Sequence, residues 1–186
     1  MNSVQSLSSL TVAKFGGTSV ADYQAMLRCA NIIKNDSSNR LVVVSASSGV
    51  TNLLVRLSQK NVSVIEQKDI IENIRAIQVN ITQHLSSDVE AQLNQEIDSL
   101  LDELTQHALT QLLQYSTRTG DAILAFGEQF SSRIFAQVLQ SVDIPGEYFN
   151  VQQVMKTNSL YGKAVVDLNQ LSEQSRQLLA PKLVNN

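Results

Sequence analysis

The stretch VAKFGGTSVADY, residues 12–23, decides how the rest of the chain is interpreted. A run typical of a β-strand, expected over Ser9 to Phe15, carries Lys14 near its end and is followed by two adjacent glycines, Gly16 and Gly17. A strand, a glycine turn and a helix in this order are typical of the opening of an α/β domain.

The helix after the glycines is expected to begin at Val20, with Ser19 as its N-cap and Asp22 in a weak capping box. The next apolar run, Leu41 to Ser45, is continuous and bounded by polar residues. Such a run is typical of a parallel strand that is buried on both faces. A polar loop and a short helix near Thr51 to Gln59 complete an opening βαβ unit.

The glycine turn is a candidate phosphate site. Gly16 and Gly17 place no Cβ in the way of a ligand, and a helix beginning at Val20 would offer free N–H groups. Lys14 adds positive charge at the end of the strand, where ligands bind in open α/β sheets. The pattern is neither a Walker motif nor G-x-G-x-x-G. A tight turn beside an exposed lysine explains the same residues equally well.

Two further segments are candidates. The loop SASSGVTN, residues 45–52, again follows a strand, and its hydroxyl groups could hold a carboxylate or a phosphate, although Thr51 could simply be an N-cap. Glu128 lies in AILAFGEQFSSRIFAQVL and falls on an apolar stripe of a helix expected over Thr119 to Ser141. A buried carboxylate needs a partner, which a ligand, an arginine or a backbone donor could supply. Gly127 beside it would permit a close approach.

The remaining pattern predicts a helical hairpin that turns at residues 84–88, a third strand over Glu147 to Val151 and a last helix over Leu168 to Leu179 that Pro181 ends. Three strands are few for this many helices, since a typical sheet has about five or six. The sheet is therefore expected to be incomplete within this chain.

Composition excludes several classes of protein. The 186 residues carry a net charge of -3, which favours neither nucleic acid as a partner nor a disordered acidic tail. Cys29 is the single cysteine and suits a helix position in a reducing compartment. His84 and His107 have no metal-ligand spacing, and no metal site is predicted. Without a secretion signal or a long apolar run, a cytoplasmic protein without a membrane span is expected.

Three segments taken together, KFGGTSV, VVVSASSGVTNLL and GEQFSSRIF, resemble the aspartokinases of the amino-acid kinase superfamily, most closely the lysine-sensitive bacterial type. VMKTNSLYGKA resembles a further segment of that family. The resemblance covers about Val12 to Leu183. It implies a three-layer αβα fold of the carbamate kinase-like type, with a mostly parallel sheet, here incomplete, and a helical hairpin insertion.

The resemblance also implies an activity, the phosphorylation of the L-aspartate side chain by ATP to 4-phospho-L-aspartate, at the start of lysine, threonine and methionine synthesis. Lys14 would be catalytic and would bind the ATP phosphates together with Gly16, Gly17 and Thr18. The substrate L-aspartate would be bound by three residues, namely Ser45, Thr51 and Glu128, the last through the α-ammonium group. Mg²⁺ would be held mainly by the phosphates.

Residues 1–186 resemble only the N-terminal part of the aspartokinase catalytic domain. The nucleotide-binding part and the ACT regulatory domains of the family have no counterpart in this sequence, so the chain alone is expected to be inactive. The full-length enzyme is expected to form homo-oligomers, and the isolated chain to dimerise or aggregate. The alternative is a non-catalytic paralogue that binds aspartate or another subunit. An unrelated dinucleotide-binding domain is disfavoured, since G-x-G-x-x-G is not in the sequence.

Overall fold

The computed structural model describes residues 11–36 and 38–184, so the first residues of the expected Ser9 to Phe15 strand lie outside the described part. In chain order the elements are β1 (Thr11–Phe15), the 3-10 turn η1 (Gly17–Val20), α1 (Tyr23–Lys34), β2 (Asn39–Val44), α2 (Val50–Leu57), α3 (Val64–Thr82), α4 (Ser87–Leu113), α5 (Thr117–Leu124), α6 (Phe126–Ser141), the 3-10 turn η2 (Val151–Gln153), α7 (Leu168–Gln174), the π-helical turn η3 (Ser175–Leu179) and α8 (Ala180–Val184).

The two strands form a small parallel sheet, as the predicted βαβ unit requires. Lys14 of β1 is level with Val43 of β2, and Phe15 is level with Val44. The Ser45 N–H continues the ladder by donating to the Phe15 carbonyl oxygen at 3.1 Å. Because parallel strands end at the same edge of a sheet, the loops that follow Phe15 and Val44 lie side by side.

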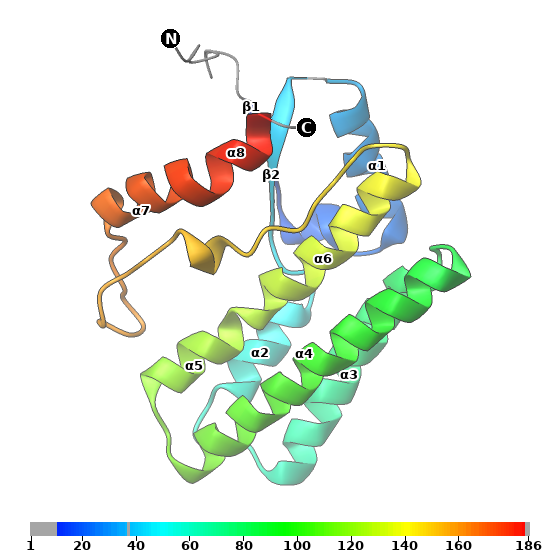
Figure 1. The fold of residues 1–186 in the computed structure, drawn as a ribbon. Helices are drawn as coiled ribbons and strands as arrows, with labels where there is room; N and C mark the ends of the chain where they lie inside the picture. The colour runs from blue at the N-terminus through cyan, green and yellow to red at the C-terminus, as the bar shows by residue number, and fades with distance from the viewer. Residues whose placement is uncertain (1–10, 37, 185–186) are drawn as a thin grey trace.

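Only one face of this sheet belongs to the core. Phe15 and Val44 face inward, and the Phe15 ring lies 5.9 Å from the ring of Phe135 in α6. On the opposite face Val12 is 51% exposed and Val43 is 44% exposed. The prediction of a strand buried on both faces is therefore wrong for the described residues. Figure 1 shows α1 on one side of the strands and the α7–α8 segment on the other, where it covers them only in part.

The helical hairpin is confirmed as α3 and α4, which turn at the predicted break before Ser87. Its interior contains apolar residues of both helices, including Ile74, Ile97 and Leu104. Figure 1 shows the pair running alongside α2 and α6. Three glutamines of the described residues, Gln67, Gln78 and Gln111, are buried in this region, which the amphipathic pattern did not predict, and Gln67 donates to the Ala108 carbonyl oxygen at 3.0 Å.

The buried side chain of Gln111 in α4 links this helix to the segments after α2 and before α5. Its Nε2 donates to the Ser58 carbonyl oxygen after α2 at 2.6 Å, and its Oε1 accepts from the Ser116 N–H before α5 at 3.1 Å. We expect Gln111→Ala to lower the free energy of unfolding by about 1–3 kcal/mol, because both backbone groups lose their partner. Urea unfolding measures this, and exposed Gln106→Ala on the same helix is the control. Equal stability of the two variants would contradict the assignment.

The expected helix over Thr119 to Ser141 is divided into α5 and α6 at Ala125. The Ala125 N–H is shared between the carbonyl oxygens of Asp121 and Ile123, which tightens the last turn of α5. Directly after the break, Gly127 packs against Ala46, and a Cβ on Gly127 would lie only 2.7 Å from the Ala46 methyl carbon. The prediction of one continuous helix was therefore wrong at a single turn residue, Ala125, whose backbone stays in the right-handed helical region.

The expected third strand over Glu147 to Val151 is also wrong. The chain is extended before η2 but forms no strand, and side chains of α6 hold it instead. Gln140 donates to the Gly146 carbonyl oxygen at 2.7 Å, and the Arg133 guanidinium lies 4.1 Å from the centre of the Tyr148 ring. Pro181 does not end the last helix either, because it is the second residue of α8.

Cys29 and the two histidines have structural positions. Cys29 is buried in α1 and donates to the Ser19 carbonyl oxygen at 3.2 Å, and burial raises the pKa of its thiol, which makes it a poor nucleophile. His84 stacks on Tyr23 with ring centres 5.0 Å apart, and His107 lies edge-on to Phe126 at 5.7 Å. Each of the three side chains thus contacts other residues of the fold.

Candidate functional site

The glycine turn after β1 places a lysine beside the second loop. The Lys14 ammonium group donates to Ser45 Oγ at 3.2 Å. Gly16 lies next to this ammonium group, since a Cβ added to Gly16 would be 3.8 Å from Lys14 Nζ. Lys14 is exposed, and among the described residues it forms no ion pair with a carboxylate. This ammonium group is therefore available to an anionic ligand.

The helix start expected at Val20 is wrong. Residues Gly17 to Val20 form a single 3-10 turn, closed by the Ser19 N–H donating to the Gly16 carbonyl oxygen at 2.9 Å. Helix α1 begins only at Tyr23, and Asp22 is its N-cap because its carboxylate accepts from the Ala25 N–H. Ser19 is not a cap. Thr18 is exposed within the turn.

The second loop lies between β2 and α2. Gly49, with φ of 86°, is the N-cap of α2, so Thr51 is the second residue of the helix and not its cap. A left-handed φ is accessible to glycine at little cost, which explains this residue at the turn. Ser47 is only 1% exposed, and its hydroxyl is a buried oxygen without a hydrogen-bond partner among the described residues. The Ser47 hydroxyl is a polar group that the sequence alone did not single out.

Glu128 is exposed, so its predicted burial is wrong. The apolar stripe was drawn through Leu124, Phe135 and Leu139, but only the last two are buried, and Leu124, one turn before Glu128, is 36% exposed. Glu128 instead occupies the first turn of α6, where a carboxylate is favoured by the helix dipole. It accepts a long hydrogen bond, 3.4 Å, from the Ala46 N–H, and no described lysine or arginine forms an ion pair with it.

The structure thus brings together three of the predicted segments at the carboxyl edge of the sheet. Lys14 contacts Ser45 directly, and Glu128 contacts the following residue, Ala46. Gly17 belongs to the same assembly, because a Cβ on it would lie 2.8 Å from the Ala46 carbonyl oxygen. Thr51 is exposed at the start of α2, and no hydrogen bond joins its side chain to the other candidates in the described part.

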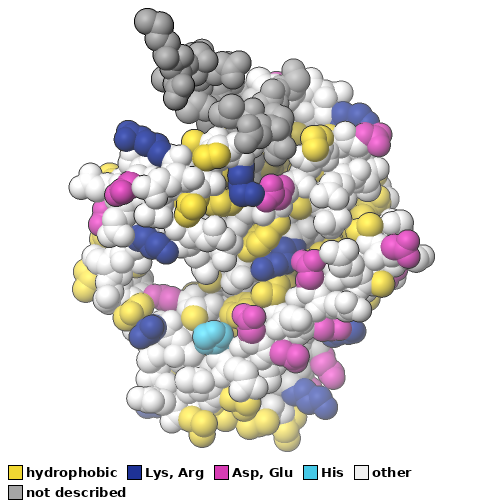
Figure 2. Space-filling model, viewed as in Figure 1, with side chains coloured by type: hydrophobic (Ala, Val, Ile, Leu, Met, Phe, Trp, Pro, Cys, Tyr) yellow, Lys and Arg dark blue, Asp and Glu magenta, His cyan; other side chains and the backbone are white. Residues whose placement is uncertain are grey.

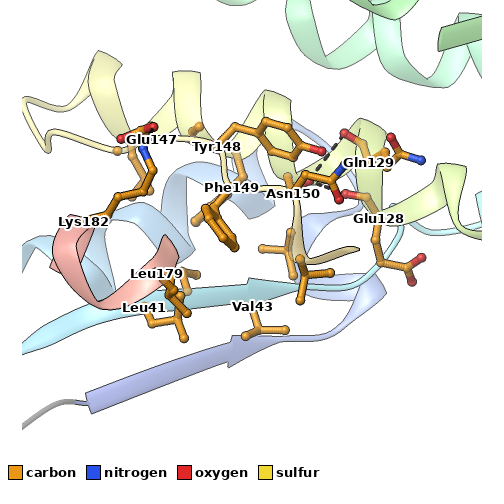
Figure 3. A pocket seen from close by; sticks show the side chains of 18 of the residues that line it. Leu41, Val43, Glu128, Gln129, Glu147, Tyr148, Phe149, Asn150, Leu179 and Lys182 are labelled. Atoms are coloured by element: carbon orange, nitrogen blue, oxygen red, sulfur yellow. Dashed lines mark hydrogen bonds and ion pairs between the residues drawn. The ribbon is translucent and has the colours of Figure 1, made fainter. Parts of the chain in front are cut away.

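An apolar groove of about 650 Å³ lies next to this assembly, between β2, α6, the extended segment before η2 and the last helical turns. Figure 3 shows Glu128 and Gln129 near one end of the groove and Glu147 with Lys182 near the other, with Phe149 and Leu179 between them. Lys14, Ser45 and Thr51 do not line the groove. The candidate site is therefore the loop edge, and the groove reaches it only at Glu128.

The charge distribution agrees with a small-molecule site. Figure 2 shows acidic and basic side chains interspersed over one face of the molecule, without a region of a single sign.

Among the described residues no group of three or more His, Cys, Asp and Glu side chains is placed to hold a metal ion. None of the helices in residues 11–36 and 38–184 has the length and apolar character needed to cross a lipid bilayer.

Comparison with known proteins defines the class. The amino acid kinase family matches residues 9–185, and the chain belongs to this family. Within it the chain is 38% identical to the lysine-sensitive aspartokinase 3 of Escherichia coli K12, over 95% of this chain and 39% of that protein. It is also 45% identical, over 44% of this chain and 67% of the relative, to a Haemophilus influenzae protein named "Putative inactive aspartokinase 3".

Solved structures agree with the sequence matches. The crystal structure of E. coli aspartokinase III in complex with lysine and aspartate superposes with a TM-score of 0.89 at 38% identity, over 95% of this chain and 39% of that one. The structure of that enzyme with aspartate and ADP gives the same TM-score at 37% identity and the same coverage. The predicted aspartokinase-like fold is confirmed, and the chain spans about two fifths of the length of the E. coli protein.

Proposed function

We propose that this chain is the aspartate- and phosphate-binding segment of an aspartate kinase, which transfers the γ-phosphoryl group of ATP to the side-chain carboxylate of L-aspartate. The observation that supports it most is the assembly of Lys14, Ser45 and Glu128 at one edge of the sheet. An exposed ammonium group and an exposed carboxylate, each without an ionic partner among the described residues, suit ligands that carry phosphate and ammonium groups.

The proposed roles follow from the charge of each group. Lys14 binds the ATP phosphates with Gly16, Gly17 and Thr18 and stabilises charge on the transferred phosphoryl group. Glu128 binds the α-ammonium group of L-aspartate. Ser45 and Thr51 contact the same substrate through their hydroxyl groups. The E. coli relative has been crystallised with aspartate and ADP, which are the ligands expected at such a site.

Catalysis in this proposal needs no general base. The substrate carboxylate is already ionised and nucleophilic at neutral pH, so the protein contributes positioning and charge stabilisation. An exposed lysine above a glycine fits a phosphate group that must approach closely. Mg²⁺ bound with ATP would reduce the repulsion between the two anions, and its ligands would come mainly from the phosphates.

The complete activity is proposed for the whole protein, of which residues 1–186 supply the N-terminal part of the catalytic domain. Its product would be 4-phospho-L-aspartate, which opens lysine, threonine and methionine synthesis in the cytoplasm, and the full-length enzyme would be homo-oligomeric. We expect no turnover from this chain alone, because it corresponds to 39% of the length of the E. coli enzyme. Measurable formation of ADP by the isolated chain would contradict this expectation.

A second candidate function is a non-catalytic module that binds aspartate or another aspartokinase subunit. The observation that favours it is the name of the H. influenzae relative, which describes that protein as inactive. The two functions differ in one measurable respect. A catalytic segment must bind a polyphosphate through Lys14 as well as aspartate, whereas an aspartate-binding module needs no phosphate site.

Isothermal calorimetry of the chain tests the proposed function. We expect binding of L-aspartate but not of succinate, which lacks the α-ammonium group. We also expect binding of Mg-tripolyphosphate, which presents the phosphates of ATP without its base and ribose, and Lys14→Met should weaken this binding by at least about 10-fold, since a hydrogen bond to a charged group contributes about 1.5–3 kcal/mol. Lys163→Met, at an exposed lysine of the 154–166 segment, is the control. Equal binding of succinate and L-aspartate would refute the assigned role of Glu128. Aspartate binding without tripolyphosphate binding would favour the non-catalytic module.

A further inference from the structure

Ala46 is a buried residue against which two glycines from separate elements pack. A Cβ on Gly17, in the turn after β1, would lie 2.8 Å from the Ala46 carbonyl oxygen. A Cβ on Gly127, in the first turn of α6, would lie 2.7 Å from the Ala46 methyl carbon and 3.2 Å from Leu54 Cδ1. The 2.8 Å and 2.7 Å distances are shorter than the contacts that Cβ atoms make with other heavy atoms in proteins. Neither glycine can therefore carry a side chain unless its neighbours shift.

The same residue is joined to the groups that would bind ligand. Its N–H donates to Glu128 Oε1 at 3.4 Å, and the preceding residue, Ser45, accepts a hydrogen bond from Lys14. Ala46 therefore lies between the glycine turn, which follows the strand that carries Lys14, and the helix that carries Glu128. It is 4% exposed, so it acts on the site through its neighbours.

We propose that Ala46 is the positioning residue of this site. Its carbonyl oxygen limits how closely the glycine turn approaches, its methyl group limits how closely α6 approaches, and its N–H orients the Glu128 carboxylate. Ala46 thereby sets the spacing between the phosphate-binding and ammonium-binding groups. This inference rests on the proposed function for its consequence in ligand binding, but the geometry itself can be tested without any ligand.

The two glycine contacts predict opposite outcomes in a rescue experiment. Gly127→Ala adds a methyl group that collides with the Ala46 methyl, and Ala46→Gly removes that methyl, so the double variant regains the spacing. Gly17→Ala collides with the carbonyl oxygen of residue 46, which Ala46→Gly retains. The second double variant is a matched control, because both carry the backbone entropy cost of a glycine at position 46.

The first readout needs no ligand. In an NMR pH titration of the wild-type chain, the chemical shift of the Ala46 amide is expected to change together with the side-chain carbon signal of Glu128. The two signals should have the same titration midpoint, because the amide donates to this carboxylate. Gly127→Ala loses this correlation, and Gly127→Ala with Ala46→Gly regains it. Unchanged correlation in Gly127→Ala would overturn the proposal. If Gly127→Ala does not fold, the double variant is still expected to fold, and its failure would overturn the proposal too.

The second readout is the Kd for L-aspartate. Gly127→Ala and Gly17→Ala are each expected to weaken binding by at least about 10-fold, because sub-ångström misplacement of binding groups is costly. Only the Gly127→Ala defect is corrected by Ala46→Gly. Correction of both defects, or of neither, would overturn the proposal. If the wild-type chain does not bind aspartate, the proposed function fails and the amide titration alone decides the role of Ala46.

Discussion

Replacing Glu128 by glutamine is expected to weaken L-aspartate binding by roughly 10- to 100-fold, since the interaction of an ionised carboxylate with an ammonium group contributes about 1.5–3 kcal/mol. Glutamine keeps the shape of the side chain and can still accept from the Ala46 N–H, so the fold and the loop geometry should persist. The variant removes only the charge that would face the substrate ammonium. Calorimetric titration with L-aspartate measures the effect.

Glu103→Gln is the matched control for this prediction. Glu103 is an exposed acid on α4, in the helical hairpin, and its replacement changes the net charge by the same amount. Because Glu128 is exposed, its attraction for a cation is screened by salt, and the difference between the two variants should shrink as ionic strength rises. Equal aspartate affinity of the two variants at low salt would remove Glu128 from the proposed site.

The largest effect on stability is expected for Phe130→Ala, which should lower the free energy of unfolding by about 3–5 kcal/mol. Phe130 is 0% exposed, and its ring lies 6.3 Å from that of Phe126 on the same helix. Removing it leaves a cavity in the core beneath α6, the helix that also carries Glu128. Urea unfolding followed by circular dichroism measures the loss.

The control for Phe130→Ala is Leu113→Ala at the end of α4. Leu113 is 86% exposed, so its truncation removes little buried apolar surface and should change stability by less than about 0.5 kcal/mol. A loss below about 1 kcal/mol for Phe130→Ala would mean that α6 does not pack in the core as described.

Much of the fold could be predicted from residue patterns that act locally. Three local patterns each specify an element without reference to the rest of the chain: the apolar run of β2, the helical spacing of apolar residues such as Ile74 in α3 and Ile97 and Leu104 in α4, and the polar break between these helices. The loops that follow the two strands could also be placed together, because the carboxyl ends of parallel strands share one edge of a sheet.

The errors arose where distant segments decide the local structure. Glu128 was expected to be buried because its helical stripe also carries Phe135 and Leu139, whereas the end of the stripe at Leu124 and Glu128 lies at the surface. The segment containing Tyr148 has the composition of a strand, but contacts with α6 hold it away from pairing. Buried Gln111 was missed because its backbone partners, after α2 and before α5, are remote in sequence.

The sequence by itself determined the family, the order of the main elements and the residue types at the candidate site, since motifs such as KFGGTSV specify chemistry through residues that are close along the chain. Only the tertiary structure decided which of these residues meet. It places Lys14 on Ser45, Glu128 at the surface beside Ala46, and two glycines against that alanine. The physical reason is that close packing between elements depends on backbone positions that no local pattern encodes.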